Sequence, residues 1–572
     1  MKDNLSNERC YCLYFPLFEQ RRLLRADFWR KKRFVKLRGL VRRPLIFFIL
    51  SLFLLFPSFF LYAQEDNQPC YGDAIIVGSI GEPITLVPIL AADSASQDIV
   101  GLVFNGLLKY DKDINLVGDL AEDWEVSEDG LVITFYLRKG VKWQDGVPFT
   151  AEDVLFTYKK LVDPHTKTPY SGDFERIKKF EVIDDYTIKI TYKQPFSPAL
   201  ASWTMPIMPS HLLKNEEDFK HFARHPVGTG PYRFIKWETG SKIVLEAYDE
   251  YFQGRPYIDR YIYYIIPDQS TLFLELKNRN LDYISLTPLQ YQRQTNTEFF
   301  KKNFRKYRYL SFGYTYIGWN LNNPKFKDKR VRQAINYAID KEEIIKGVLL
   351  GLGRVCTGPF VPNSWAYNPA VKPAEYNPEK ARQLLALAGW KKKDKEGILL
   401  KGNERFEFTL LTNQGNVSRR KCAEIIQQKL REIGIKMHIK IVEWGCLLDL
   451  IERREFEAVL LGWGLSRDPD CYDIFHSSKT GPREFNFVSY KNKEVDRLLE
   501  EGRRVFSQSK RKEIYQKVHK LIYEDQPYTF LYVPDALPII DARFRGIEPT
   551  INGIGYNFIK WWVPKDKQRF KR

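Results

Sequence analysis

The chain has 572 residues, of which 44% are hydrophobic and 15% aromatic, a composition typical of a globular protein with room for two or three domains. Its net charge of +18 is unevenly placed, because residues 1–43 hold thirteen Lys or Arg against four Asp or Glu. No stripe of Arg and Lys interleaves with aromatic residues in the remainder, which argues against nucleic-acid binding.

The first predicted element is an apolar run at residues 45–62. It follows Arg42-Arg43 and precedes Ala63, and this order of charged, apolar and small residues predicts a signal peptide cleaved after Ala63. Eighteen residues with Pro57 inside also fit a short membrane anchor that is retained. Both outcomes place the rest of the protein outside the cytoplasm, in the periplasm or its extracytoplasmic equivalent.

The next elements are a strand at residues 73–77 and a dense strand, turn and helix pattern at residues 120–161. Residues 131–137 alternate branched and aromatic side chains, as a half-buried strand does. Thr150 then fits the N-cap of a helix with carboxylates in its first turn, and this helix should end before Pro164.

Further strands and helices follow along the chain. Strands are predicted at 180–192, 243–248, 258–266, 316–320, 406–412, 435–442 and 530–533. Helices are predicted at 270–277, 328–338, 377–390, 417–433 and 494–523. The alternation of strands and helices in the second half predicts an α/β region with a mixed or mainly parallel sheet.

Three motifs resemble those of family 5 of the bacterial extracellular solute-binding proteins, the oligopeptide- and dipeptide-binding group. The first is carried by Ala121, Trp124, Leu137, Arg138, Gly140, Trp143, Asp145, Gly146, Phe149, Thr150, Ala151, Asp153 and Val154. The second is G-T-G-P-Y at residues 228–232, and the third is the run from Asn323 to Ala334. The chain departs from the family at Arg279, where a glycine is usual.

The resemblance implies an α/β fold of the two-lobed periplasmic-binding-protein type (type II, cluster C-like), with an extra subdomain in lobe one and two hinge crossings. The expected division is an N-terminal extension with the signal or anchor at 1–63, lobe one with the inserted subdomain at 64–315, lobe two at 316–530, and a return to lobe one at 531–572. The lobes should close around a ligand by a hinge.

In oligopeptide-binding members, two tryptophans with the separation of Trp444 and Trp463 line the cleft, and an aspartate three residues after the second receives the peptide ammonium. That position is Ser466 here. Since a buried ammonium needs a counter-charge, either Asp468 or Asp470 replaces it, or the ligand is held differently. The alternative for both aspartates is a simple turn around Pro469.

The resemblance also implies ligand contacts elsewhere in the cleft. The positions are Glu82, Ser285, Asn320, Gly464 and Tyr532. Glu82 lies in a segment that the family places at the lip of the cleft, and its alternative is an ordinary surface glutamate.

Enzyme motifs are missing from the sequence, which has no G-x-S-x-G, no Walker A and no H-E-x-x-H. His221 and His225 have helical spacing but no third ligand, which favours a surface pair over a metal site. We therefore expect no catalytic residues, no metal and no cofactor. The cysteines after the apolar run are five in number and lack CxxC spacing, so their pairing stays open.

The sequence is thus interpreted as a monomeric extracytoplasmic solute-binding protein of an ABC importer. Short peptides are the expected cargo, while nickel chelates, oligosaccharides and opines stay open because family members bind all of these. The partners implied are a membrane permease and an ATPase, with no nucleic acid and with membrane contact through the permease or residues 45–62. The alternatives are a secreted hydrolase and a solute-sensing regulator on the same fold.

Overall fold

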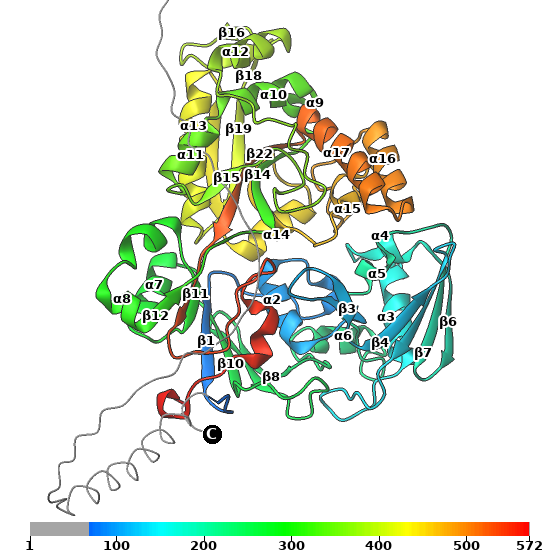
Figure 1. Ribbon diagram of the computed structural model, residues 1–572. Helices are drawn as coiled ribbons and strands as arrows, with labels where there is room; N and C mark the ends of the chain where they lie inside the picture. Colours follow the sequence, from blue (N-terminus) through cyan, green and yellow to red (C-terminus); the bar gives the residue numbers. More distant parts are fainter. Residues whose placement is uncertain (1–67, 167, 571–572) are drawn as a thin grey trace, which may run out of the picture. The chain divides into compact units, whose positions relative to one another are not determined.

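Two seven-stranded sheets organise the chain, and each collects strands from distant parts of the sequence (Figure 1). The structure is a computed structural model that describes residues 68–166 and 168–570. The predicted signal or anchor at residues 45–62 lies outside these ranges. Inside them, no helix has both the length and the apolar character needed to cross a membrane.

The first sheet joins the beginning and the end of the described chain. In spatial order its strands are β12 (Phe304–Lys306), β23 (Pro538–Asp541), β11 (Tyr283–Ser285), β1 (Ala74–Ser79), β10 (Arg260–Ile265), β9 (Lys242–Ala247) and β8 (Tyr232–Glu238). β1 is parallel to β10 and β11, whereas β23 is antiparallel to both of its neighbours, β11 and β12. A late strand therefore lies inside a sheet made mainly of early ones.

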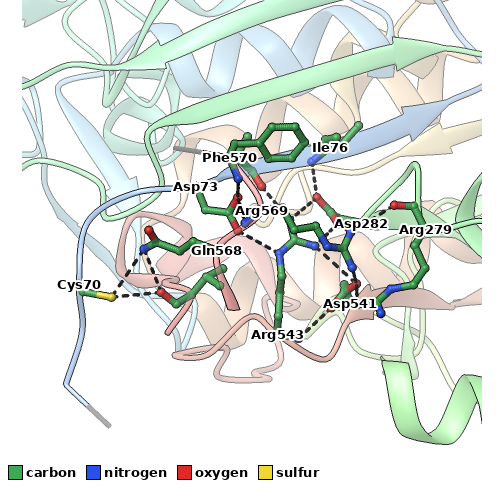
Figure 2. A network of polar contacts seen from close by, with 12 residues as sticks. Cys70, Asp73, Ile76, Arg279, Asp282, Asp541, Arg543, Gln568, Arg569 and Phe570 are labelled. Carbon is green, nitrogen blue, oxygen red and sulfur yellow. Dashed lines mark hydrogen bonds and ion pairs between the residues drawn. The ribbon is translucent and has the colours of Figure 1, made fainter. Parts of the chain in front are cut away.

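A buried network of charges ties the C-terminal segment to this sheet (Figure 2). Arg543 donates from Nε to Asp73 at 3.0 Å and from Nη2 to Asp282 at 2.8 Å. Arg569 donates to Asp541 at 2.5 Å. Burial raises the pKa of Asp282 despite the charge of Arg543. Burial also acts to raise the pKa of Asp541, but the Arg543 amide and the charges of Arg543 and Arg569 outweigh it, so this pKa is lowered.

Arg279 belongs to the same network and explains how the chain tolerates its departure from the family. Its backbone has φ of +64°, the left-handed region in which glycine carries no steric penalty. The guanidinium donates to Asp541 at 3.0 Å, as Figure 2 shows. An ion pair thus offsets part of the backbone strain that the missing glycine would have avoided.

The second sheet is mixed, as the sequence predicted. In spatial order its strands are β13 (Tyr309–Leu310), β22 (Tyr528–Ala536), β14 (Gly313–Trp319), β21 (Ala458–Gly464), β19 (Glu407–Asn413) and β20 (Lys436–Val442), with β15 (Gly353–Val355) on β22. β19 is parallel to β20 and β21, and β14 is antiparallel to β21 and β22. The strands predicted at 316–320 and 530–533 are neighbours in this sheet, where Tyr316 pairs with Phe530.

Smaller sheets complete the strand set. The four-stranded sheet is β4 (Ala121–Val126), β5 (Val132–Leu137), β7 (Thr187–Tyr192) and β6 (Ile177–Asp184), and the others are β2 (Leu108–Tyr110) with β3 (Leu116–Gly118), and β16 (Lys392–Lys393), β17 (Leu399–Lys401) and β18 (Glu404–Arg405). The prediction of one strand at 180–192 was wrong, because β6 and β7 form a hairpin. Asp184 accepts the amide of Tyr186 at 2.8 Å, a local turn bond that reverses the chain.

Helices surround these sheets. Those that precede the second sheet are α2 (Ser94–Val103), α3 (Ala151–Val162), α4 (Ser171–Phe174), α5 (Ala199–Ser202), α6 (Glu216–Phe222), α7 (Gln269–Lys277) and α8 (Glu298–Asn303). Those that lie between the strands of the second sheet along the chain are α9 (Pro324–Lys327), α10 (Lys329–Ala338), α11 (Lys341–Gly347), α12 (Pro378–Leu387), α13 (Val417–Glu432), α14 (Trp444–Glu452), α15 (Tyr472–Phe475), α16 (Lys493–Arg504) and α17 (Gln508–Asp525). Short helical turns are η2 (Pro88–Leu90), η3 (Gln290–Gln294), η4 (Gly555–Lys560) and η5 (Lys565–Lys567).

The helix starts follow the capping chemistry read from the sequence. Thr150 and Asp153 form a capping box at α3, and Asp328 caps α10 by accepting the amide of Arg330. The single helix predicted at 494–523 was wrong, because α16 and α17 are separated at residues 505–507, where Val505 is extended. The break lets the two helices pack against each other around Tyr515 and Gly502.

Candidate functional site

A cavity of about 1060 Å³ lies between segments that pack beside the first sheet and segments of the second sheet and its loops. On the side of the first sheet its wall is made by η2, α2, α4 and α5 and the loops beside them. On the other side the wall is made by segments that follow strands of the second sheet. The same cavity thus takes its lining from residues that are hundreds of positions apart.

The topology of the second sheet explains why the cavity lies here. The parallel strands β19, β20 and β21 end at Asn413, Val442 and Gly464, and their carboxyl ends share one edge of the sheet. In open α/β sheets, ligands bind outside this edge, where loops leave the strands. The segments that follow these ends carry Arg419 and Trp444, and all of them line the cavity.

Trp463 and Trp444 both line the cavity and are half-buried. The Trp463 ring is parallel to Tyr316 at 6.4 Å and meets Phe485 edge-on at 5.4 Å, and its Nε1 donates to the Tyr528 hydroxyl at 3.3 Å. The ring is therefore fixed in position before any ligand arrives. Trp444 differs, because its Nε1 is buried without a hydrogen-bond partner in the described part of the chain.

Asp468 and Asp470 line the cavity, but each is already neutralised by a buried arginine. Asp468 accepts two hydrogen bonds from Arg511, at 2.8 and 2.9 Å. Asp470 accepts from Arg503 Nε at 2.7 Å. Bidentate and buried pairs of this kind are the strong ones, so neither carboxylate offers a free charge to a ligand. Gly464 also lines the cavity.

Ser466 lies at the position that receives the ammonium in oligopeptide-binding members, and it also lines the cavity. Its side chain is hydrogen-bonded to the phenol of Tyr110, which lies in β2, in a different part of the fold. Burial raises the pKa of Tyr110 to about 12, with the charge of Asp468 adding to the rise. This corner of the cavity therefore contains a neutral hydroxyl pair in place of a carboxylate.

The other sequence-predicted ligand residues do not join this group. Glu82 accepts from Trp237 Nε1 at 2.8 Å and from the Gly240 amide at 3.1 Å, so it braces β8 against the following turn. Ser285 is exposed on β11 and pairs with Pro538. Among the described residues, neither lines the cavity.

Asn320 and Tyr532 are both buried beside or within the second sheet, and neither lines the cavity. The Asn320 amide donates to the Phe456 carbonyl at 2.8 Å and closes the end of β14. Tyr532 packs in the apolar core with 3% of its surface exposed. Asn320 directly follows β14 and Tyr532 lies in β22, and the contacts of both are with the protein itself.

Sequence reasoning missed several charged lining residues, among them Asp98 and Arg419. Asp98 on α2 is exposed to the cavity, and burial within its walls together with the charge of Asp93 raises its pKa to about 7. Arg419 donates to Asn413 Oδ1 at 2.8 Å, and no carboxylate of the described chain contacts it. Burial lowers the pKa of Arg419.

One local signal could have identified Arg419. It occupies the first turn of α13, where a cation opposes the helix dipole and where an acidic residue is favoured. Such a conflict between local preference and fold is typical of functional positions. Asp98 offered a weaker signal, because its helix neighbours at three and four positions away carry no positive charge.

Two glycines of the G-T-G motif hold α2 in place. A Cβ on Gly228 would lie 1.8 Å from the Val103 carbonyl oxygen, and one on Gly230 would lie 2.6 Å from it. The Gly230 amide donates to this same carbonyl at 2.8 Å. The glycines are therefore required because the segment that leads into β8 passes close to the backbone at the end of α2.

Direct contacts close the cavity at its edges. Arg503 reaches Asp173 at 2.9 Å, and the Ser197 amide donates to the Arg503 carbonyl at 2.7 Å. Tyr170 meets Phe485 edge-on at 5.7 Å. These contacts join α4 and its neighbouring loops to α16 and to the loop after α15, so the structure holds the two walls together.

Within the described ranges, no group of three or more His, Cys, Asp or Glu is placed to hold a metal ion. His221 and His225 stack at 4.4 Å on the surface. The five cysteines of the same ranges are free thiols. The arrangement is suited to binding a solute by aromatic surface, backbone groups and a few charges.

Comparison with known proteins gives a consistent picture. The sequence profile of the bacterial extracellular solute-binding proteins, family 5, matches residues 115–484. The oligopeptide-binding protein AppA of Bacillus subtilis is 38% identical over 515 residues, 88% of this chain and 94% of AppA. Its structure in complex with a nonapeptide matches with a TM-score of 0.83 at 36% identity, covering 87% of this chain and 100% of that one.

Two further solved structures are similar. NikZ from Campylobacter jejuni in complex with Ni(L-His) has a TM-score of 0.78 and 32% identity, and the match covers 86% of this chain and 99% of NikZ. The periplasmic binding protein DppA from Helicobacter pylori, in complex with the peptide STSA, has a TM-score of 0.79 and 28% identity, with 87% of this chain and 99% of DppA covered. The mixed α/β fold is shared by all of them.

Proposed function

Because the chain belongs to family 5 of the bacterial extracellular solute-binding proteins, we propose that it is the peptide-binding component of an ABC importer. This membership confirms the resemblance read from the sequence. It also confirms the prediction of a binding protein, because the family consists of solute-binding proteins and not of enzymes.

The observation that carries the peptide assignment is the cavity at the carboxyl edge of the second sheet. Its volume of about 1060 Å³ reaches the upper end of the range for small-ligand pockets, roughly 300–1,000 Å³. Aromatic rings such as Trp463 and Phe485 line it. An extended peptide pairs its backbone with main-chain groups, while aromatic walls cover side chains of many kinds.

The charges of the cavity support a ligand with a carboxylate. Arg419 lines it and lacks a carboxylate partner in the described chain. An arginine fork binds a carboxylate through two parallel hydrogen bonds, and burial strengthens that attraction. We assign Arg419 as the residue that receives the carboxylate of the peptide.

The proposal includes two lobes that close on the ligand. Strands of the first sheet come from residues 74–306 and 538–541, and those of the second from 309–536. The chain changes sheets at two places that run side by side, where the Tyr307 amide donates to the Pro538 carbonyl at 2.9 Å. This pair of crossings is suited to a hinge, with the four-stranded sheet as the inserted subdomain of lobe one.

The same proposal sets where the protein works. Export by the segment at residues 45–62, either cleaved after Ala63 or kept as an anchor, would place both lobes outside the cytoplasm. The loaded monomer would then deliver its peptide to a membrane permease, and a separate ATPase would supply the energy.

Native mass spectrometry of protein purified from its own host tests this function. The expected result is a bound mass in the range of short peptides, which disappears after mild denaturation and can be sequenced by fragmentation. A bound mass with the isotope pattern of nickel would refute the peptide assignment, and so would a failure of every peptide in a random library to bind the emptied protein.

A further inference from the structure

We propose that Asp98 is the ligand-binding carboxylate of the cavity and that it pairs with the positively charged group of the bound molecule, the terminal ammonium if that molecule is a peptide. The inference rests on the proposed function and deepens it. It moves the cation-binding position from the loop after Trp463, where the sequence placed it, to helix α2 on the opposite wall.

The first argument is that most other acidic groups of the cavity are held by cations of the protein itself. Five lining carboxylates lie within 3.2 Å of an arginine or lysine nitrogen: Asp173, Glu452, Asp468, Asp470 and Glu484. Asp473 has a weaker contact, 4.0 Å from Lys479 Nζ. Asp93 caps α2, where it accepts from the Ser96 amide at 3.0 Å and from the Ser96 hydroxyl. A cationic ligand would have to break one of these contacts to use any of them.

Asp98 is different, because it lines the cavity while no hydrogen bond or ion pair involves its carboxylate within residues 68–166 and 168–570. Its own helix offers no cation, since positions 94, 95, 101 and 102 are Ser, Ala, Gly and Leu. The titratable groups coupled to it electrostatically are the carboxylate of Asp93 and the phenols of Tyr261, Tyr263 and Tyr283. Burial raises the pKa of each phenol, and the charge of Asp98 adds to the rise.

The second argument is energetic. Asp98 is exposed to the cavity but has no partner in the described chain, and the protein around the cavity raises the pKa of its carboxyl to about 7 because the charged form loses hydration there. Lobes that close on an uncharged ligand would leave this group either protonated or unpaired. A ligand that brings a positive charge offsets the lost hydration and so gains affinity that a neutral ligand cannot.

The geometry of the rival position supports the same choice. Ser466 is hydrogen-bonded to Tyr110, and the two aspartates that follow it are held by Arg511 and Arg503. On the wall of the second sheet, Arg419 and Arg454 line the cavity without forming an ion pair in the described chain, and Arg454 donates only to backbone carbonyls. On the opposite wall Asp98 has no cationic partner among the described residues, so a zwitterionic ligand such as an unmodified peptide complements charges of both signs.

The pairing has a defined pH dependence. In the closed cavity the pKa of Asp98 is raised to about 7, and an ammonium bound beside the carboxylate would lower it. Binding to the closed form should therefore release protons near pH 7, and affinity should rise as the pH increases from about 5 to 7. Above about pH 8 the affinity should fall again, because the α-amino group of the peptide then loses its own charge.

The test is calorimetric titration of the wild-type protein, emptied of ligand, with tetra-alanine and with N-acetyl-tetra-alanine. Asp98→Asn keeps the size of the side chain but removes its charge. The matched control is Glu217→Gln, which removes a charge from a side chain that is 83% exposed on α6. Melting curves establish that each variant is folded, and titrations in phosphate and Tris buffers give the number of protons released.

We expect Asp98→Asn to weaken binding of tetra-alanine by at least about 10-fold, to leave the acetylated peptide unchanged and to abolish proton release, with Glu217→Gln like the wild type. If Asp98→Asn still prefers the free amine as strongly as the wild type, the inference is wrong while the peptide function stands. If the wild-type protein binds neither these peptides nor any in a wider library, the proposed function fails and takes the inference with it.

Discussion

Arg503 on α16 reaches Asp173 on α4 across the edge of the cavity, with 2.9 Å between Nη2 and Oδ1. The arginine is almost fully buried, at 1% exposure of its side chain, and it also holds Asp470. One guanidinium therefore fixes a loop of the cavity and binds the opposite wall at the same time. In the proposed two-lobed protein it is a contact that exists only while the lobes are closed.

Replacing Asp173 by Asn should therefore speed ligand release. Arg503 keeps Asp470 as a partner, so the loss is limited to the contact between the walls, about 1 kcal/mol, or a 3- to 10-fold faster dissociation rate. Stopped-flow tryptophan fluorescence measures this rate. Glu175→Gln, an exposed neighbour, is the control. An unchanged dissociation rate would show that the pair does not hold the closed form.

Replacing Trp463 by Ala should weaken ligand binding by about 1–3 kcal/mol, as the removal of central aromatic anchors does. The ring also packs on Tyr316 and Tyr528, so thermal stability should fall as well. Titration per folded molecule separates the two effects. Trp390 packs in the apolar core between the second sheet and its helices, so Trp390→Ala should lower the melting temperature without changing the affinity for ligand. Unchanged affinity in folded Trp463→Ala would contradict a ligand role.

Asp468→Asn should destabilise the protein by about 3 kcal/mol, because it leaves the buried guanidinium of Arg511 without its counter-charge. Urea denaturation measures the change. We expect the preference for free-amine over N-acetylated peptides to survive in the folded variant. Loss of that preference without loss of stability would identify Asp468, and not Asp98, as the ammonium partner.

The left-handed backbone at Arg279 predicts an ordered series of stabilities. Arg279→Ala keeps the strain of a φ of +64° and loses the ion pair with Asp541, and it should be less stable than the wild type by about 0.5–1 kcal/mol. Arg279→Gly loses the pair but relieves the strain, so it should lie close to the wild type. Thermal denaturation measures the order. An alanine variant as stable as the glycine variant would rule out backbone strain.

Asp541→Asn should lower stability at neutral pH by about 2 kcal/mol and have little effect in acid. Burial alone would raise the pKa of Asp541, but the Arg543 amide and the charges of Arg543 and Arg569 lower it. A lowered pKa means that the contribution is fully present above about pH 4 and is lost as the pH falls through the folded-state value. Urea denaturation between pH 3 and pH 7 measures the difference, which should shrink toward pH 3.

Elements with strong local signals could be predicted from the sequence. The capped start of α3 at Thr150 and the strand β5 follow from neighbouring residues alone. The hairpin of β6 and β7 and the break between α16 and α17 were missed, because each was read as one continuous run of favourable residues. In both cases a short turn inside the run was overlooked, at Asp184 and at Ser507.

The cavity was predictable only in part, for a physical reason. Trp444 and Trp463 were identified through the resemblance to oligopeptide-binding proteins, and both line it. Whether a charge is free for a ligand depends on what tertiary contacts have already neutralised. Asp468 looks available in the sequence but is held by Arg511 from 43 positions away. Asp98 looks unremarkable in the sequence, and the fold leaves it without a partner among the described residues.

The place of β23 in the first sheet has a consequence for how the chain is made. This strand inserts between β11 and β12 and is fixed by Arg543, so the sheet stays incomplete until residues beyond 541 have been synthesised. All strands of the second sheet lie in the single stretch from 309 to 536, and that half can fold as soon as it emerges. A product truncated before β23 would thus leave an open sheet edge exposed to aggregation.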